Sequence, residues 1–200
     1  MTVVSTAEVR VEVDGRRLRR KQNRDAVLDA LAELFEEGNL QPTSGEIAER
    51  AGLSPRSLFR YFDDVDDLNH AAIDRELARA RPLLDAGTVA SDPTAVKIDR
   101  VVEARIRLFE AIAPAARSAR VGAHRHYLVA AQIAQSRSYL RNQLRQLFAP
   151  ELNGTALLPA LDALLSFETF ELLRGDQKLS RSKTASALTA ALAALLEGHG

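Results

Sequence analysis

The spacing of apolar residues along this chain predicts an all-α protein. From residue 27 onward, apolar residues recur at intervals of three and four, which is the period of an amphipathic helix. The first of these helices should end at Gly38, and Pro114 should end another, because proline disfavours a helical conformation in the residue before it. The apolar pattern predicts further helices over residues 66–84, 92–113, 115–148 with a break near Gly122, 157–173 and 184–196.

Two short helices are predicted within the twenty residues that start at Thr43. Thr43 and Glu46 have the spacing of a capping box, in which each side chain accepts from the other residue's backbone N–H. Gly52 stands where a helix can end in a left-handed conformation without a Cβ clash. Ser54 is a favourable N-cap residue, and Pro55 suits the first position of a helix. Two helices joined by such a turn form a helix-turn-helix, whose second helix enters the major groove of DNA.

The exposed face of the second helix carries residues able to contact DNA. Arg56 and Arg60 are four residues apart and therefore share one face, whereas Leu58 points into the domain. Ser57 and Tyr61 flank the two arginines. Arginine can bind O6 and N7 of guanine, and serine and tyrosine can reach phosphates. Two arginines alone are more typical of a solvated face, but the helix caps and the four-residue turn favour the DNA-binding interpretation.

Two charged clusters flank this motif. A basic run without an acid precedes it, made of Arg16, Arg17, Arg19, Arg20, Lys21 and Arg24. Such a segment can follow the phosphate backbone or reach a minor groove, and it can equally be a disordered, solubilising arm. An acidic cluster follows the motif, made of Asp63, Asp64, Asp66 and Asp67. These acids complement the dipole at the start of the next helix and should keep that end away from phosphates.

The first seventeen residues have a different pattern from the rest. Residues 9–14 alternate strictly between apolar and charged side chains and end at Asp14-Gly15, a dipeptide typical of hairpins. This segment could form a short ribbon with a partner subunit or a loose arm with strand propensity. Because an isolated strand has nowhere to bury its face, we expect a flexible arm over residues 1–17.

Residues 18–84 resemble the N-terminal domain of tetracycline-repressor (TetR) family regulators. The pattern that carries the resemblance is a basic-flanked first helix, then Thr43-Ser44 before Ile47-Ala48, then Ala51-Gly52-Leu53-Ser54, then Leu58-Phe59-Arg60-Tyr61-Phe62, with Leu68 six residues later. The resemblance implies a homodimeric, all-helical, ligand-responsive regulator of transcription, usually a repressor. The family usually has Tyr where Phe59 stands and a phosphate-binding Lys where Val65 stands, so those two backbone contacts are not carried over.

The motifs and the resemblance together predict the domain organisation. We expect a three-helix DNA-binding domain over residues 18–65 and a ligand-sensing and dimerisation bundle over residues 66–200, with a long connecting helix over residues 66–84. The expected partner is a palindromic DNA operator bound by a homodimer. The predicted DNA contacts are Arg16, Arg17, Arg19, Arg20, Lys21, Thr43, Ser44, Ser54, Arg56, Ser57, Arg60 and Tyr61.

The last two helices are the predicted dimer interface. The helix over residues 157–173 is apolar on more than one side and must pack against two neighbours. One neighbour can be a second subunit, or both can belong to a monomeric bundle. The predicted interface residues are Leu161, Leu165, Phe170, Leu188, Leu192 and Leu195.

A pocket for a small-molecule effector is expected among the middle helices, between residues 97 and 173. Bundle cores build such sites from facing helices, and this part of the chain is rich in apolar residues. The effector should therefore be apolar, with an anionic group favoured by the nearby arginines. The candidate pocket residues are Arg105, Phe109, His124, Tyr127, Gln132 and Phe167, with His126 and Tyr139 as further polar candidates. Each of them can equally be an ordinary core or surface residue.

Composition restricts the remaining classes of function. The 27 basic and 27 acidic residues cancel, so any positive field must be local. The lack of cysteine excludes disulfides and thiolate metal sites, and we expect neither a metal nor a cofactor. Without a signal peptide or an apolar run of membrane length, a cytoplasmic protein is expected. The chain has no phosphate-binding glycine loop, serine elbow or zinc motif, so we do not expect an enzyme. The alternative is a constitutive or architectural DNA-binding protein without an effector.

Overall fold

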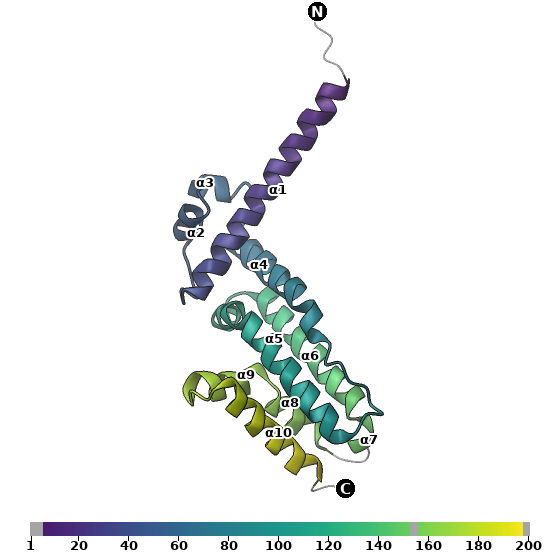
Figure 1. Ribbon diagram of the computed structural model, residues 1–200. Helices are drawn as coiled ribbons and strands as arrows, with labels where there is room; N and C mark the ends of the chain where they lie inside the picture. Colours follow the sequence, from purple (N-terminus) through teal and green to yellow (C-terminus); the bar gives the residue numbers. More distant parts are fainter. Residues whose placement is uncertain (1–5, 153–155, 198–200) are drawn as a thin grey trace, which may run out of the picture. The chain divides into compact units, whose positions relative to one another are not determined.

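The computed structural model describes residues 6–152 and 156–197, with side chains described from residue 17 onward. Within these residues the chain is helical and contains no strand, which confirms the predicted fold class (Figure 1). The α-helices are α1 (Thr6–Glu36), α2 (Ser44–Arg50), α3 (Pro55–Leu58), α4 (Val65–Ala80), α5 (Thr94–Gly122), α6 (Tyr127–Leu147), α7 (Ala149–Leu152), α8 (Leu158–Leu164), α9 (Phe167–Glu171) and α10 (Arg181–Glu197). A 3₁₀ turn, η1 (Arg81–Leu84), follows α4, and a π turn, η2 (Leu172–Asp176), follows α9.

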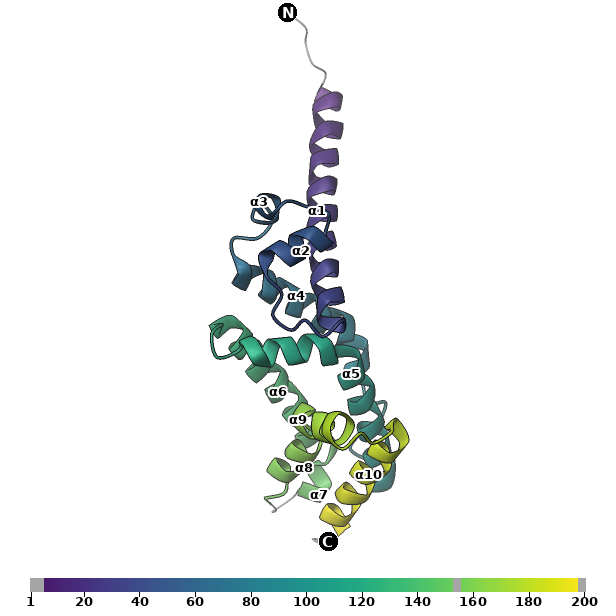
Figure 2. The same cartoon turned by 90° about the vertical axis from the view of Figure 1, so that its left-hand side faces the viewer.

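The helices form two compact units. The first unit contains Met1–Arg75 and Pro114–Ala130, and the second contains Glu76–Ala113 and Ala131–Gly200. In the first unit, α2 and α3 lie beside α1, as Figures 1 and 2 show. Their shared core consists of Val27, Leu28, Leu31, Leu34, Phe35, Ile47, Ala48, Leu58, Phe62, Leu68 and Ala72. This core joins α1, both helices of the helix-turn-helix and the start of α4.

The predicted helix ends of the helix-turn-helix are confirmed. Thr43 and Glu46 form the capping box that begins α2, and Ser54 caps α3 with Pro55 in its first turn. Gly38 and Gly52 have φ of +89° and +66°, in the left-handed region that favours glycine. After Gly52, the N–H of Leu53 bonds the carbonyl of Ala48 at 2.8 Å, as in a Schellman motif. These local contacts fix the turn between α2 and α3.

The prediction of a flexible arm over residues 1–17 is wrong for residues 6–17, which are helical, and residues 1–5 lie outside the described residues. Residues 9–14 lie within α1, which already begins at Thr6. Extending an existing helix fixes one residue for each new hydrogen bond, whereas a lone strand would gain no partner. The arginines and the lysine that follow also have good helix propensity. The basic run is therefore part of a regular helix and not of an irregular arm.

Two further boundaries differ from the prediction. Pro114 lies inside α5 and does not end it, and residues 114–130 belong to the first unit instead of the bundle. A proline inside a helix loses one backbone hydrogen bond, so the turns after it need another source of stability. Ala115 packs against the core of the first unit, and the hydroxyl of Ser118 donates to the carbonyl of Leu40 at 2.8 Å. These contacts hold the end of α5 in the first unit.

The second unit is a helical bundle. The break near Gly122, the connecting helix from residue 66 and the last helix are close to their predicted positions. The prediction of one continuous helix over residues 157–173 is wrong, because the chain is interrupted there between α8 and α9. There Ser166 donates its hydroxyl to the carbonyl of Ala163 and accepts from the N–H of Thr169, which ends one helix and caps the next. Ion pairs tie α8 and α10 to the longer helices, as between Arg141 and Asp162 at 2.6 Å.

Candidate nucleic-acid interface

The second helix of the helix-turn-helix is shorter than predicted. α3 ends at Leu58, and the N–H groups of Arg60 and Tyr61 bond the carbonyls of Ser57 and Leu58 at 3.2 and 3.0 Å. These bonds span three residues and form a tight turn that continues the helix direction only briefly. Arg56 therefore projects from α3, and Arg60 from the turn that follows. Both side chains are exposed.

A basic hollow joins this turn to α1. It is lined by Arg19, Arg20, Asn23, Arg60 and Tyr61. The amide of Asn23 donates to the hydroxyl of Tyr61 at 2.7 Å, which fixes the ring beside the arginines. Asn23 was not among the predicted contacts. Its signal in the sequence is its position three and four residues after Arg20 and Arg19, on the same side of one helix.

Paired and unpaired cations are separated within the first unit. Arg50 bonds Glu37 at 2.8 Å and Glu33 at 3.4 Å, and Arg75 bonds Asp29 at 2.8 Å. The hydrogen bond from Arg50 lowers the pKa of the Glu37 carboxyl. By contrast, eight exposed cations of the first unit have no ion pair among the residues whose side chains are described. Two of them are Arg24, whose guanidinium lies over the ring of Phe62, and Arg125 on the segment between α5 and α6. The other six lie on α1, on α3 and on the turn after α3, and they are Arg17, Arg19, Arg20, Lys21, Arg56 and Arg60.

The acids near these cations are committed to the start of α4. The carboxylate of Asp64 accepts from the N–H of Asp67 at 2.8 Å, and that of Asp67 accepts from the N–H of Asp63 at 3.1 Å. This agrees with the capping role predicted for the acidic cluster as far as Asp64 and Asp67 are concerned, whereas the carboxylate of Asp66 lies against His126. The whole chain has no net charge, so the positive field of the basic surface is local.

Two of the predicted DNA-contact residues that carry a hydroxyl group, Thr43 and Ser54, also cap helices. The hydroxyl of Thr43 donates to Glu46 at 2.7 Å and accepts from its N–H at 3.3 Å, and the hydrogen bond from the Thr43 backbone lowers the pKa of Glu46. Ser54 accepts from the N–H of Ser57 at 3.2 Å. Ser44, the first residue of α2, is half-buried. The side chain of Arg16 lies outside the described residues.

Phe59 and Val65 place apolar side chains on the surface of the first unit. They are 44% and 36% exposed, at the two positions where the resemblance suggests polar contacts. Neither side chain can form a hydrogen bond, so the two polar contacts that the resemblance suggests are not available from these residues.

The predicted effector residues are divided between the two units. His124 and Tyr127 are exposed in the first unit, whereas Arg105, Phe109, Gln132 and Phe167 belong to the second. The guanidinium of Arg105 is buried, which lowers its pKa to about 10, and it donates to Gln143 and to the carbonyl of Leu140. The ring of Phe109 packs against those of Phe167 and Phe170, with 5.5 and 5.6 Å between the ring centroids. The side chains of Arg105 and Phe109 therefore already have partners within the second unit.

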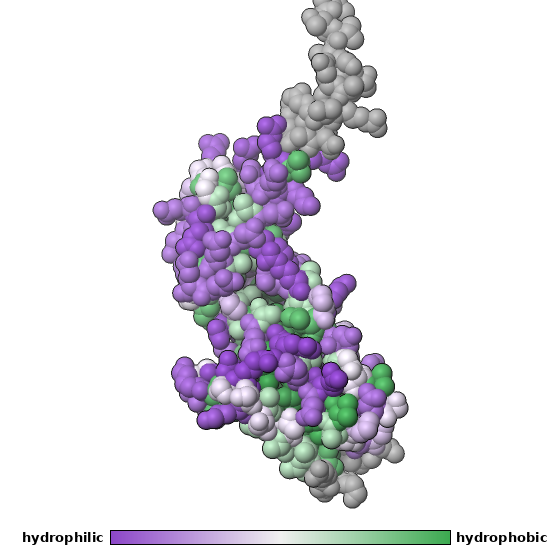
Figure 3. All heavy atoms as spheres, in the orientation of Figure 1, coloured by the Kyte–Doolittle hydropathy of each residue, from purple (hydrophilic) through white to green (hydrophobic). Residues whose placement is uncertain are grey.

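Five of the six predicted interface residues are buried within a single chain. They are Leu161, Leu165, Phe170, Leu188 and Leu192. Leu195 is half-buried. An apolar helix pattern cannot distinguish packing within a chain from packing between chains, and the chain's own helices already bury these five residues. The outward side of α10 carries alanines instead, and Figure 3 shows pale green atoms where Figure 1 draws this helix.

Two other kinds of site are absent from the described residues. No group of three histidine, aspartate or glutamate side chains there could hold a metal ion. None of the described helices is long and apolar enough to cross a membrane.

Comparisons with known proteins agree with this geometry. Residues 27–72 match the family model of the bacterial regulatory proteins of the tetR family. No curated protein matches the chain. A solved structure described as a TetR-family transcriptional regulator from Rhodococcus sp. is 20% identical, with a TM-score of 0.66 over 87% of this chain and 98% of the other. A transcriptional regulator from Rhodococcus sp. Rha1 is 18% identical, with a TM-score of 0.65 over 90% of this chain and 96% of the other.

A third structure has the same fold. It is described as a transcriptional regulator from Streptomyces coelicolor A3(2), and it is 22% identical, with a TM-score of 0.60 over 88% of this chain and 98% of the other. At these identities the three structures show a common fold, while the match over residues 27–72 gives the family of the DNA-binding domain. Residues 27–72 therefore carry the signature of the DNA-binding domain of tetR-family regulatory proteins, in a chain whose fold is shared with solved structures described as transcriptional regulators.

Proposed function

We propose that this regulator binds a palindromic DNA operator as a homodimer, represses transcription from it in the cytoplasm, and is released by a small molecule. The observation that supports DNA binding most directly is the set of six exposed cations without ion pairs on α1, α3 and the turn after α3. Cations left unpaired at one surface are available to neutralise phosphates, which provides most of the affinity for DNA.

The geometry suggests two classes of contact. Arg56 and Arg60 extend from α3 and its following turn, the part of a helix-turn-helix that reads base edges. Arg17, Arg20 and Lys21 lie on one face of α1, because they are three and four residues apart. These residues are suited to phosphate contacts that position the domain without reading sequence.

For the dimer, we propose the outward side of α10 in place of the buried leucines. Ala187, Ala190 and Ala194 are exposed there at intervals of three and four, and Leu195 beside them is half-buried. Small side chains allow two helices to approach closely, and a two-fold partner would present the same stripe. Such a dimer reads two half-sites about one helical turn of DNA apart, or a multiple of that distance.

Selection from a random DNA pool tests the function. The purified full-length protein should enrich a palindromic sequence, and Arg60→Ala should weaken binding to that sequence more than to scrambled DNA. Arg107→Gln is the matched control, because Arg107 is an exposed arginine on α5 outside the first unit. Failure to enrich any sequence would contradict sequence-specific regulation and leave the constitutive, architectural alternative.

A further inference from the structure

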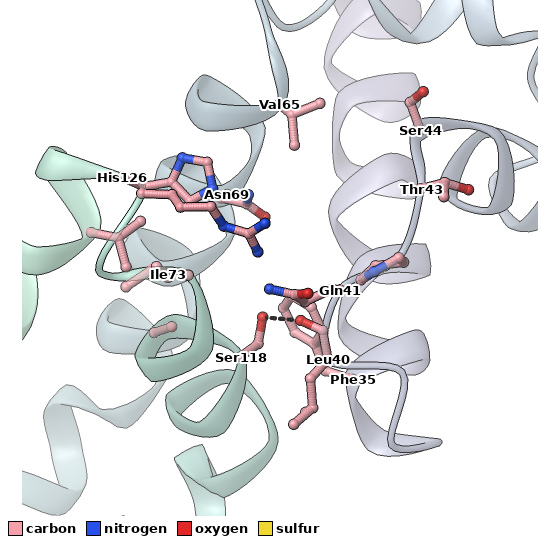
Figure 4. Close-up of a pocket in the computed structure, with 15 residues that line it drawn as sticks. Phe35, Leu40, Gln41, Thr43, Ser44, Val65, Asn69, Ile73, Ser118 and His126 are labelled. Atoms are coloured by element: carbon pink, nitrogen blue, oxygen red, sulfur yellow. Dashed lines mark hydrogen bonds between the residues drawn. The ribbon is translucent and has the colours of Figure 1, made fainter.

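A hollow with a volume of about 380 Å³ lies within the first unit (Figure 4). Three segments form its walls: the loop between α1 and α2, the first half of α4, and the end of α5 with the start of α6. All fifteen lining residues belong to the DNA-binding unit. The volume is within the range of pockets that hold small organic ligands.

The walls combine an apolar surface with a few polar groups. Phe35, Ile73 and Val129 are among the apolar lining residues. Figure 4 shows the side chains of Gln41 and Asn69 directed toward the space between the three segments. A pocket that is apolar on its sides and has a few converging polar groups is suited to an amphipathic molecule.

The charge of the walls favours an anion. Arg125 lines the hollow, and no lining residue is acidic. Arg125, Gln41 and Asn69 have no hydrogen-bond or ion-pair partner for their side chains among the described residues. Nδ1 of His126, which also lines the hollow, lies 2.5 Å from a carboxylate oxygen of Asp66, and Asp66 itself is not a lining residue. A guanidinium with two amides nearby presents several N–H donors to one ligand.

We propose that this hollow binds a small organic carboxylate with an aromatic or branched apolar body. The apolar body lies against Phe35, Ile73 and Val129, and the carboxylate accepts hydrogen bonds from Arg125 and from the amide of Asn69. An arginine can hold a carboxylate through two parallel hydrogen bonds, which gives both affinity and selection against neutral and cationic molecules.

The position of the hollow gives the ligand an effect on DNA binding, and this consequence rests on the proposed function. Thr43 and Ser44 at the start of α2 and Val65 at the start of α4 also line it. A bound carboxylate therefore contacts the residues on either side of the helix-turn-helix and adds a negative charge next to them. The ligand and DNA should each weaken binding of the other by the same factor, because coupling between two sites is reciprocal.

Calorimetric titration of the full-length protein without DNA tests the site. The probes are 2-naphthoate, its neutral analogue 2-naphthamide and the cation 2-naphthylmethylamine. We expect saturable binding of 2-naphthoate at one site per chain, with the amide about tenfold weaker and the cation weaker still. Arg125→Gln should remove the preference for the acid over the amide, and Arg107→Gln should leave it unchanged. Arg125 is exposed, so its replacement should not affect folding.

Three results would overturn the proposed site: no saturable binding of 2-naphthoate, equal binding of acid and amide, or a preference that persists in Arg125→Gln. A second titration measures operator affinity with and without saturating 2-naphthoate. Weaker DNA binding supports the coupling, and unchanged affinity refutes it. If the free protein binds no DNA, the proposed function fails while the result for the carboxylate site still stands.

Discussion

Charge substitutions should separate the residues that read DNA sequence from those that only hold phosphates. Arg56→Ala or Arg60→Ala should each cost about 1–3 kcal/mol of operator binding and relax the preference at one base pair. Arg17→Gln or Lys21→Gln should weaken binding to operator and scrambled DNA equally. The reason is that a phosphate contact is present on every sequence, whereas a base-edge contact needs its matching base.

The structure also sets the size of the salt effect. Each phosphate neutralised contributes about 0.9 to the slope of log affinity against log salt concentration. With four unpaired exposed cations of α1 in each chain, which are Arg17, Arg19, Arg20 and Lys21, a dimer could reach a slope of about 7 from these contacts. Removing one cation from both chains should reduce this slope by about 1.8. Between 50 and 200 mM salt, the loss of affinity of such a variant should therefore be about twelvefold smaller than that of the wild type.

Fluorescence anisotropy with labelled operator and scrambled duplexes at four salt concentrations measures both quantities. Arg107→Gln is the control for the loss of an exposed arginine elsewhere. The reasoning would be refuted if Arg60→Ala left the ratio of operator to scrambled affinity unchanged, or if Arg17→Gln left the slope unchanged. If Arg107→Gln reduced the slope of log affinity against log salt concentration by the same amount, the unpaired cations of the first unit would not be the residues that contact phosphates.

Three further changes test other parts of the structure. The wild type should sediment as a dimer at micromolar concentration, and Ala190→Glu should give folded monomers, because it adds a charge to an exposed position of α10; a monomeric wild type would contradict the interface. Glu151→Gln should lower the unfolding free energy at pH 7 by about 3 kcal/mol, because Lys97 is 1% exposed and bonds Glu151 at 2.6 Å. Burial of Glu151 opposes its ionisation, but hydrogen bonds such as that from Lys97 outweigh burial and lower its pKa, so the pair's contribution is present above about pH 4.5 and lost at lower pH. Urea titrations of wild type and variant should then converge at acid pH. Gly52→Ala should cost about 1–2 kcal/mol in thermal unfolding, since the φ of +66° is strained for alanine although no atom lies within 4 Å of the added Cβ.

Features set by neighbouring residues were predictable from the sequence. The capping box at Thr43, the cap at Ser54 and the left-handed turn at Gly52 are all present. Each depends on atoms within about five residues, so the sequence pattern contains the whole interaction. The exposure of Arg56 and Arg60 follows in the same way, from the spacing of the buried Leu58 beside them.

Features that depend on distant packing were not predictable. Pro114 should end a helix locally, but Ala115 and Ser118 gain contacts with the DNA-binding unit that no local pattern contains. The alternation over residues 9–14 indicates a strand only if a partner strand exists. Leu161 and Leu192 are apolar in the way an interface requires, yet the chain's own helices bury them completely. Sequence periodicity gives the side of a helix that is buried, and it does not give the surface that buries it.

The division of the chain into units bears on how an effector could act. Three helices pass from one unit into the other: α4 after Arg75, α5 between Ala113 and Pro114, and α6 after Ala130. A ligand bound in the bundle would have to act along these continuous helices, and Pro114 removes one backbone hydrogen bond at the crossing in α5. A carboxylate in the hollow of the first unit needs no such path, because Thr43 and Val65, on either side of the helix-turn-helix, line the same hollow. Its effect on DNA binding should therefore persist in Phe109→Leu, a change that reduces the aromatic cluster of the bundle and leaves the first unit intact.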